Sequence, residues 1–378
     1  MFKLSEEQIM VKQSAREFAQ SVLHPGVIER DEKQEFPHDQ VKQMGELGFM
    51  GMMVDTKYGG SGLDTVSYVL AMEEIAKIDA SAAVIMSVNN SLVCWGIQEY
   101  GTEEQKQKYL KPLARGLIHG AFCLSEPEAG SDATAQKTIA INQGDHYLLN
   151  GTKNWITNGN TASVYIVVAQ SNADKKHKGI NVFIVDKDSP GVQVGPKENK
   201  MGIRASDTHS IMFTDVKVPV TNRIGEDGFG FSFAMKCLSG GRIGIASQAL
   251  GIAAGAFELS VKYANERKSF GKEIIRHQGI AFKLADMKTS IEAARLLCLK
   301  AAWLKDSKQD YVSASAEAKL FASQVAMDTT TEAVQVHGGY GFVKEFHVER
   351  MMRDAKITQI YEGTSEIQKL VIARGLIE

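Results

Sequence analysis

The sequence predicts an α+β protein, mostly helical, in which a small antiparallel β-domain separates two helical domains. Apolar residues recur at helical spacing up to about residue 119 and again from about residue 227. Between these regions, short apolar runs alternate with turn residues, which is typical of strands. A chain of 378 residues exceeds what one compact core usually holds. We therefore expect three domains, covering residues 1–119, 120–226 and 227–378.

The first domain carries two capping signals. Ser5 and Gln8 have the spacing of a capping box, and so do Thr102 and Gln105. After the first cap, one helical face gathers the apolar residues Val11, Ala15, Phe18 and Val22. The pattern ends at Pro25. Further helical stretches are expected from residue 39 onward, at 64–101 and at 102–116.

The middle domain shows short apolar runs instead. Those typical of strands occur at residues 146–149, 164–169, 180–185 and 210–213. Gln143-Gly144-Asp145 lies where a hairpin turn would join two strands, and Ser189-Pro190-Gly191 marks another turn. Short runs joined by tight turns favour an antiparallel sheet.

The third domain returns to helical spacing, at 281–302 and 314–336, which indicates a helix bundle. Its most apolar stretch, 243–257, is rich in Gly and Ala and too short to span a bilayer. We expect it to be a helix packed closely against its neighbours, so no membrane insertion is predicted.

Charge and cysteine usage exclude several classes of protein. The chain has 43 basic and 45 acidic residues and no basic run, which argues against nucleic-acid binding. Its four cysteines form no CxxC pair and no zinc-like set with histidine, so no metal site is predicted. So few cysteines in a long chain indicate a reduced, intracellular protein, and the charged N-terminus is unlike a secretory signal. We expect a cytoplasmic protein.

The common cofactor motifs are missing from the sequence. No GxGxxG follows a strand, no GxxxxGK[ST] loop occurs, and there is no HExxH. Any cofactor must be held by a less common architecture.

Five segments combine polar, aromatic and glycine residues, and each has an ordinary structural explanation. Residues 122–132 fit a surface loop, and the tryptophan in 153–159 fits a small core. The cations in 266–271 suit a helix end, and the glycines in 335–341 suit a helix C-cap. A glutamate in a loop such as 360–368 is ordinarily solvated.

Together, in this order, the segments match one family. The combination of SEPEAGSDA, KNWITNG, ERKSFG, HGGYGF and RDAKITQIYEGTSEIQ closely resembles the acyl-CoA dehydrogenases over essentially the whole chain, most of all their short-chain (butyryl-CoA) branch. The resemblance implies a helical N-terminal domain, a β-barrel-like middle domain and a C-terminal four-helix bundle, in agreement with the three regions above.

The resemblance also implies FAD, bound non-covalently between the second and third domains. Residues matching those beside the flavin ring system are Phe122, Leu124, Ser125, Trp155 and Thr157. Those matching the pyrophosphate and adenine contacts are Arg267, Ser269, Phe270 and Gln278. Those matching contacts to the FAD of a neighbouring subunit are Gln335, Gly338 and Gly339, and those flanking the adenosine half are Thr364 and Glu366.

Glu362 matches the family's catalytic base. A carboxylate there would remove the weakly acidic α-proton of the thioester while a hydride leaves the β-carbon for flavin N5. Negative charge on the thioester oxygen needs donors, which the family supplies from the backbone N–H of the base and from FAD. Matching substrate positions are Ser131, Ser239, Arg242, Tyr361 and Gly363. We expect the pocket wall to come from the stretches 87–96 and 235–251.

Two positions distinguish this chain within the family. Relatives of the isovaleryl type carry the base at the position of Gly241, which cannot serve, so that arrangement is disfavoured. Relatives often carry Asp where Ser239 stands, so the contact to the CoA side loses a charge.

The resemblance further implies an electron-transferring flavoprotein as electron acceptor and a homotetramer. Three alternatives remain open. An acyl-CoA oxidase would share Glu362 and pass electrons to oxygen, and a branched short-chain acyl-CoA would fit the same motifs. A non-catalytic acyl-CoA- or nucleic-acid-binding relative would keep the fold, but the retained carboxylate and the net charge of −2 argue against it.

Overall fold

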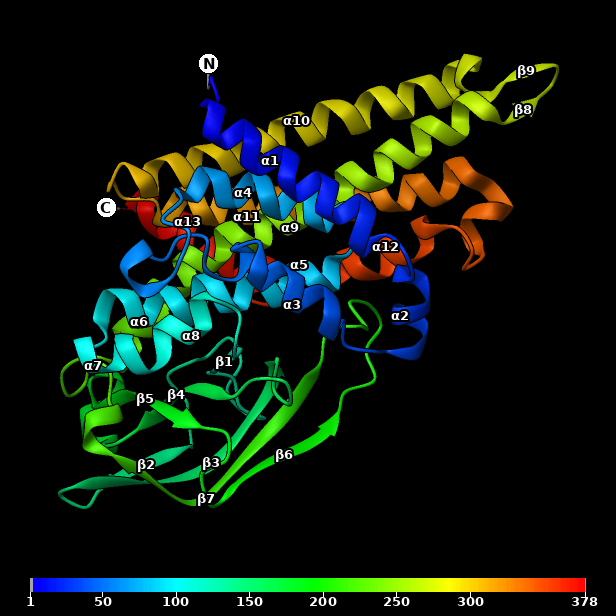
Figure 1. The fold of residues 1–378 in the computed structure, drawn as a ribbon. Coiled ribbons are helices and arrows are strands. Elements are labelled where there is room, and N and C mark those ends of the chain that lie inside the picture. Colours follow the sequence, from blue (N-terminus) through cyan, green and yellow to red (C-terminus); the bar gives the residue numbers. More distant parts are fainter. Residues whose placement is uncertain (1–2, 378) are drawn as a thin grey trace.

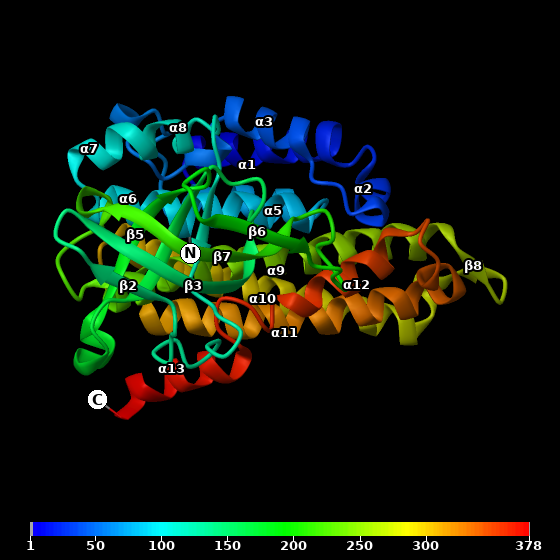
Figure 2. The ribbon, with the colours of Figure 1, turned by 90° about the horizontal axis from the view of Figure 1, so that it is seen from below.

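The chain forms helices, then a sheet, then helices again, in a computed structural model that describes residues 3–377. Three long helices, α9 (Gly230–Glu266), α10 (Gln278–Asp306) and α11 (Val312–His337), run the length of the molecule, with the sheet below one end (Figure 1). Figure 2 shows the sheet lying over that end and the short hairpin of β8 (Lys268–Ser269) and β9 (Lys272–Glu273) extending from the other. The expected α+β class is confirmed.

The N-terminal region is helical, as expected. Its helices are α1 (Glu6–Phe18), α2 (Val27–Lys33), α3 (His38–Glu46), α4 (Thr65–Ala76), α5 (Ala80–Ser87), α6 (Trp95–Tyr100), α7 (Glu103–Gln105) and α8 (Lys111–Ala114). π-helical turns at Ala19–Leu23, Val88–Cys94 and Lys106–Leu110 continue or join them. Both capping boxes are confirmed: the N–H of Gln8 donates to Ser5 Oγ at 3.1 Å, and that of Gln105 donates to Thr102 Oγ1 at 3.2 Å.

The sequence pattern did not predict α2. Its residues are mostly charged and show no apolar face, so helical periodicity is absent. Two ion pairs hold it in place, the buried pair of Arg30 with Asp79 at 3.1 Å and the partly buried pair of Asp31 with Arg353 at 2.9 Å. Tertiary contacts therefore stabilise a helix that its own sequence pattern does not predict.

The middle region is a curled, seven-stranded sheet. Its strands are β1 (Gly120–Cys123), β2 (Ile139–Asn142), β3 (His146–Thr157), β4 (Val164–Gln170), β5 (Ile180–Asp186), β6 (Val192–Lys197) and β7 (Thr208–Pro219). The order is β1-β4-β2-β3-β7-β6, and β5 also pairs with β4. All four expected runs lie in strands, and the turn at residues 143–145 joins the antiparallel pair β2 and β3.

Two of the pairings are parallel rather than antiparallel. β1 pairs with β4 over four residues, and β2 meets β4 at Ile139 and Gln170. Parallel neighbours require a long connection, and the chain between β1 and β4 supplies one that contains β2 and β3. The tight turns seen in the sequence could not predict these parallel pairings.

The C-terminal region is built on α9, which packs closely on α4. A Cβ at Gly251 would lie 2.5 Å from the carbonyl oxygen of Glu73, and one at Gly255 would lie 2.4 Å from that of Lys77. The Gly/Ala-rich stretch is thus a closely packed helix, as expected. Both expected helical stretches lie inside α10 and α11, and α12 (His347–Ile357) and α13 (Ser365–Ile377) pack against α11.

Two helical stretches are long and apolar enough, by length and composition, to cross a membrane: Ala80–Tyr100 and Gly230–Glu266. The second contains residues 243–257, which the sequence analysis judged too short to span a bilayer. That argument from length was wrong, because the helix extends well beyond this apolar stretch. Of the most apolar 18 residues in each stretch, 94% and 83% respectively are buried inside the molecule. Such burial is typical of core helices of a soluble protein.

Candidate active site

The loop between α12 and α13 carries Glu362 in an unusual backbone conformation. Glu362 has φ of +51° and Gly363 has φ of +95°. A non-glycine residue in the left-handed region costs about 1–3 kcal/mol and persists only where its surroundings fix it. Here Gln368 Nε2 donates to the carbonyl oxygens of Glu362 at 3.3 Å and Gly363 at 2.8 Å, and Lys319 Nζ donates to that of Gly363 at 2.6 Å.

The Glu362 carboxylate points at the N-terminal half of α9. A Cβ at Gly241 would lie 2.1 Å from Glu362 Oε2 and 2.9 Å from Leu92 Cδ2. Only a residue without a side chain leaves room for the carboxylate. The sequence excluded Gly241 as a base, and the structure gives it a positive role as the space that Glu362 occupies.

Glu362 Oε2 is buried and has no hydrogen-bond partner among residues 3–377. Burial raises the pKa of the Glu362 carboxyl to about 7, and the positive charges of Lys319 and Arg242 oppose that rise. A carboxyl with a pKa near neutrality is a stronger base than an exposed one and is still ionised in part at neutral pH. Its chemistry is therefore suited to taking a weakly acidic proton.

The helices expected to form the pocket wall do meet beside Glu362. Gly241 contacts Leu92, and a Cβ at Gly244 would lie 2.5 Å from Ser87 Oγ and 2.6 Å from the hydroxyl of Tyr68. On the adjoining side the Tyr361 hydroxyl donates to Gln248 Oε1, and Gln248 Nε2 donates to the carbonyl oxygen of Ala80 at 2.7 Å. These contacts pack the two stretches against each other beside Glu362.

A buried ion pair joins the two β-domain segments that the motifs singled out. Lys153 Nζ contacts Glu126 Oε1 at 2.7 Å and donates to the carbonyl oxygen of Leu124 at 3.0 Å. Glu126 also accepts from the backbone N–H groups of Lys137 at 2.6 Å and Thr138 at 3.1 Å. The loop after β1 is thereby fixed against β3.

Trp155 lies on β3 where its register with β7 shifts. Its φ is +62° and 63% of it is exposed, so it is not the core tryptophan of the ordinary explanation. Such irregularities re-aim a side chain. Thr157 follows on the same strand and is half-buried, as are Leu124 and Ser125 of the loop after β1, where the carbonyl oxygen of Ser125 accepts from the N–H of Asn154 at 2.8 Å. Phe122 is buried and stacks on Phe233 with ring centroids 6.5 Å apart.

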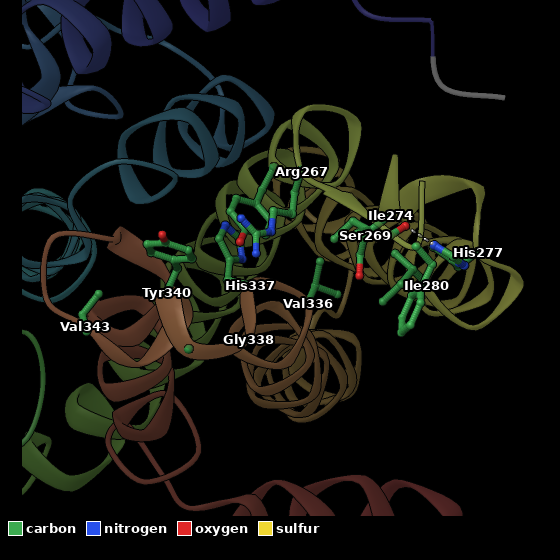
Figure 3. A pocket seen from close by; sticks show the side chains of 13 residues that line it. Arg267, Ser269, Ile274, His277, Ile280, Val336, His337, Gly338, Tyr340 and Val343 are labelled. Carbon is green, nitrogen blue, oxygen red and sulfur yellow. Dashed lines mark hydrogen bonds between the residues drawn. The ribbon is translucent and has the colours of Figure 1, made fainter. Parts of the chain in front are cut away.

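A second constellation forms an open depression of about 730 Å³ at the far end of the long helices (Figure 3). One side carries Arg267, His337 and Tyr340, and the other carries Ile274, His277 and Ile280. The Arg267 guanidinium lies 5.7 Å from the ring centre of Tyr340, and its N–H groups make no hydrogen bond among the described residues.

Two neighbouring glycines leave part of this depression open. Cβ atoms at Gly338 and Gly339 would meet nothing within 4 Å, and Gly338 has φ of +59° at the end of α11. Phe270, at the tip of the β8–β9 hairpin, is 94% exposed. The structure thus brings together Arg267, Ser269, Phe270, Gly338 and Gly339, five of the residues singled out from the sequence.

Comparison with known proteins shows to which family the chain belongs. Residues 5–117, 121–216 and 228–377 match models of the acyl-CoA dehydrogenase N-terminal, middle and C-terminal domains. The chain is 52% identical over 372 residues to the short-chain specific acyl-CoA dehydrogenase of Clostridium acetobutylicum, covering 98% of each. The chain belongs to the acyl-CoA dehydrogenase family.

Solved structures extend the likeness to three dimensions. A chain from the study of the electron transferring flavoprotein of Acidaminococcus fermentans superposes with a TM-score of 0.99 at 49% identity, covering 100% of both chains. Butyryl-CoA dehydrogenase from Megasphaera elsdenii gives 0.98 at 48% identity, again covering 100% of both. Glutaryl-CoA dehydrogenase from Mycobacterium smegmatis, in complex with FADH2, gives 0.94 at 33% identity, covering 99% of this chain and 95% of that one.

The remaining positions taken from the acyl-CoA dehydrogenase motifs are spread around the two constellations. Gln278 opens α10 and Gln335 lies near the end of α11, and both are exposed, as are Ser131 and Glu366. Thr364 Oγ1 accepts from the N–H of Ile367 at 3.3 Å and so caps α13. The Ser239 hydroxyl donates to the carbonyl oxygen of Met235 at 2.9 Å.

Motif matching missed the residues that hold these loops. Lys319, Gln368, Lys153 and Glu126 are all buried, and none belongs to the positions assigned from the family. Lys319 carried the clearest signal, because it is a lone lysine in a helical stretch of small and apolar residues. A lysine is almost never fully buried unless it is paired, so its position already indicated a specific partner.

Proposed function

We propose that this chain is an FAD-dependent dehydrogenase that converts a short-chain acyl-CoA thioester to the trans-2-enoyl-CoA, with Glu362 as the base. One observation carries the proposal: Glu362 Oε2 is buried without a hydrogen-bond partner among residues 3–377, opposite a glycine that makes room for it. An unpartnered carboxylate held in a strained loop makes no bond that stabilises the fold, which favours a functional role.

The residues of the open depression fit FAD. Arg267 offers free donors in a fork that suits phosphate oxygens, and the glycines allow close approach of a ligand to the backbone. When bound, FAD supplies the acceptor for the β-hydride at flavin N5. We assign to its binding Arg267, Ser269, Phe270, Gln278, Thr364 and Glu366, with Phe122, Leu124, Ser125, Trp155 and Thr157 on the ring side. Gln335, Gly338 and Gly339 are assigned to the FAD of a neighbouring subunit.

The chain's own residues accept the proton and stabilise the negative charge that develops on the substrate. Glu362 takes the α-proton, and a bound acyl chain that excludes water would strengthen it as a base. The backbone N–H of Glu362 donates no hydrogen bond among the described residues, so it is free for the thioester oxygen, where negative charge develops.

For the substrate we assign Ser131, Ser239, Arg242, Tyr361 and Gly363. Arg242 is buried and its Nε has no partner among residues 3–377, which leaves a donor free. The Ser239 hydroxyl already donates within α9, so it can serve a ligand only as an acceptor. A contact to the CoA side there would be weaker than one from the Asp common in relatives.

The proposal extends to organisation and partners. It comprises domains at 1–119, 120–226 and 227–378, a homotetramer, an electron-transferring flavoprotein as acceptor and a cytoplasmic location. The relative studied with the flavoprotein of Acidaminococcus fermentans supports the acceptor. The open depression and the exposed Phe270 support assembly with a second subunit, and four buried, free cysteines suit a reducing compartment.

An anaerobic titration of the purified holoprotein with butyryl-CoA, followed by visible flavin absorbance, tests the proposal. We expect stoichiometric bleaching, and then reoxidation by added electron-transferring flavoprotein with little oxygen uptake. Parallel titrations with a branched short-chain and a medium-chain acyl-CoA rank the substrates. Flavin that no acyl-CoA bleaches would contradict the proposal, and rapid oxygen consumption would replace the dehydrogenase by an oxidase.

A further inference from the structure

Lys319 is a fully buried cation that the function described so far does not use. It lies in α11 with no exposed surface, and its Nζ donates to a single acceptor, the carbonyl oxygen of Gly363, at 2.6 Å. Among the described residues it forms no ion pair with any carboxylate within 4 Å. A buried ammonium without a carboxylate in contact is costly, so its position calls for an explanation.

Its acceptor is the residue that follows the proposed base. Glu362 and Gly363 both have positive φ, and their two carbonyl oxygens accept three hydrogen bonds from only two side chains, Lys319 and Gln368. Lys319 comes from α11 and Gln368 from α13, so the loop is held from two directions. These bonds fix the strained turn that aims the carboxylate at Gly241.

The charge of Lys319 also acts on the base. Lys319 and Arg242 are the two cations that lower the pKa of the Glu362 carboxyl against the larger effect of burial. Three uncharged groups also face Glu362: the phenols of Tyr68 from α4 and of the adjacent Tyr361, and the thiol of Cys237 from α9. Two further charges act one step away, Lys305 from α10 on Cys237 and Glu366 from α13 on Lys319. Burial lowers the pKa of Lys319 to about 8, so its ammonium remains largely charged at neutral pH.

We propose that Lys319 is a positioning residue for the reaction: its hydrogen bond fixes the turn that carries Glu362, and its charge favours the ionised form of that carboxylate. Lys319 acts through Glu362, and the inference rests on the proposed function. Arg242 differs because its free donor points to a substrate role, whereas the Nζ of Lys319 is committed to the loop.

The pH dependence of kcat/KM separates the two effects, because it reports the ionisation of the base in the free enzyme. Lys319→Gln keeps a donor for the Gly363 carbonyl and removes the charge, and Lys319→Met removes both. The matched control is Lys369→Met, which deletes an exposed lysine from α13 near the same loop. Flavin content and the unfolding midpoint are measured for each holoprotein.

In Lys319→Gln we expect the acid limb of the profile to move to higher pH by about one unit or more, the usual effect of losing a nearby opposite charge. At a pH below the limb this is about a tenfold loss of kcat/KM, recovered as the pH rises. Lys319→Met should show the same shift and a lower plateau. In Lys369→Met the limb should stay near that of the wild type.

Two outcomes would overturn the inference. One is a Lys319→Gln limb that coincides with that of Lys369→Met. The other is a loss of activity at all pH values with no shift, which indicates only a structural role. The wild type distinguishes this failure from failure of the proposed function: if butyryl-CoA bleaches its flavin, the function stands whatever Lys319 does.

Discussion

The two constellations of this molecule differ in how completely one chain builds them. The carboxylate of Glu362 is enclosed, its loop is fixed by Lys319 and Gln368, and its pKa is displaced by burial. The depression around Arg267 is open, its glycines face empty space, and Phe270 is almost fully exposed. The first is preorganised by the fold, whereas the second presents donors and open backbone at the surface of the chain.

The difference matches the roles proposed for the two constellations. A general base depends on position and pKa, which require a rigid and partly dry environment. A site for a large ligand depends on free donors and open backbone. Substitutions near Glu362 should therefore change catalysis while flavin is retained, and substitutions in the depression should change flavin retention.

The largest expected effect is at Glu362, the proposed base. Glu362→Gln keeps the shape of the side chain and removes its ability to take a proton. It should retain FAD and bind acyl-CoA but lose turnover by about 10²–10⁴-fold, the usual contribution of a positioned acid–base group. Stopped-flow reduction of the flavin measures the step directly, and near-wild-type reduction would refute the assignment of the base.

Next in size is the space opposite the base. Gly241→Ala places a methyl group where Glu362 Oε2 and Leu92 Cδ2 lie, so the carboxylate must move. Displacing a reacting group by about 1 Å can cost about 10²-fold in rate. Gly240→Ala is the control, because its Cβ would meet only Lys305 Nζ, at an ordinary contact distance of 3.5 Å. Equal rates for the two variants would show that the contact at Gly241 is unimportant.

The open constellation is tested at Arg267. Arg267→Ala removes the free donors and should weaken FAD binding about 10- to 100-fold, the value of one or two charge-assisted hydrogen bonds. Lys268→Ala removes the adjacent, exposed cation and should have little effect. Fluorescence titration of apoprotein with FAD measures both, and full flavin retention by Arg267→Ala after dilution would exclude a role at the phosphates.

The smallest effect concerns stability. The Glu362 carboxyl has a pKa of about 7 in the folded protein against 4.5 as its ordinary value. Below pH 4.5 both states are protonated and burial carries no ionic cost. Between 4.5 and 7 the unfolded state releases the proton first, so this group lowers stability as pH rises.

Glu362→Gln should abolish that contribution. The unfolding midpoint of the variant holoprotein, minus that of the wild type, should increase from pH 4.5 to about 7.5. Burial also raises the pKa of Asp354, to about 6. Subtracting the wild-type midpoint from that of the variant removes the contribution of Asp354, which both proteins share. A difference that stays constant with pH would show that the carboxyl is not perturbed.

Much of the fold followed from local patterns. The capping boxes at Ser5 and Thr102, the apolar runs of β3, β4, β5 and β7 and the hairpin turn at Gly144 all appear where the sequence indicated, because each depends on neighbours in the chain. What escaped prediction depends on distant partners: α2 is held by Asp79 and Arg353, and β1 lies parallel to β4 across a long connection.

The site divides in the same way. The sequence by itself determined the family, through motifs whose order and spacing are rarely combined, and with it the proposed identity of the base. Only the tertiary structure decided that Gly241 makes room for Glu362 and that burial raises its pKa. It alone brought Lys319 to the adjacent carbonyl. The reason is physical: a motif records which side chains are present, whereas the pKa and the aim of a carboxylate are set by atoms that reach it from other helices.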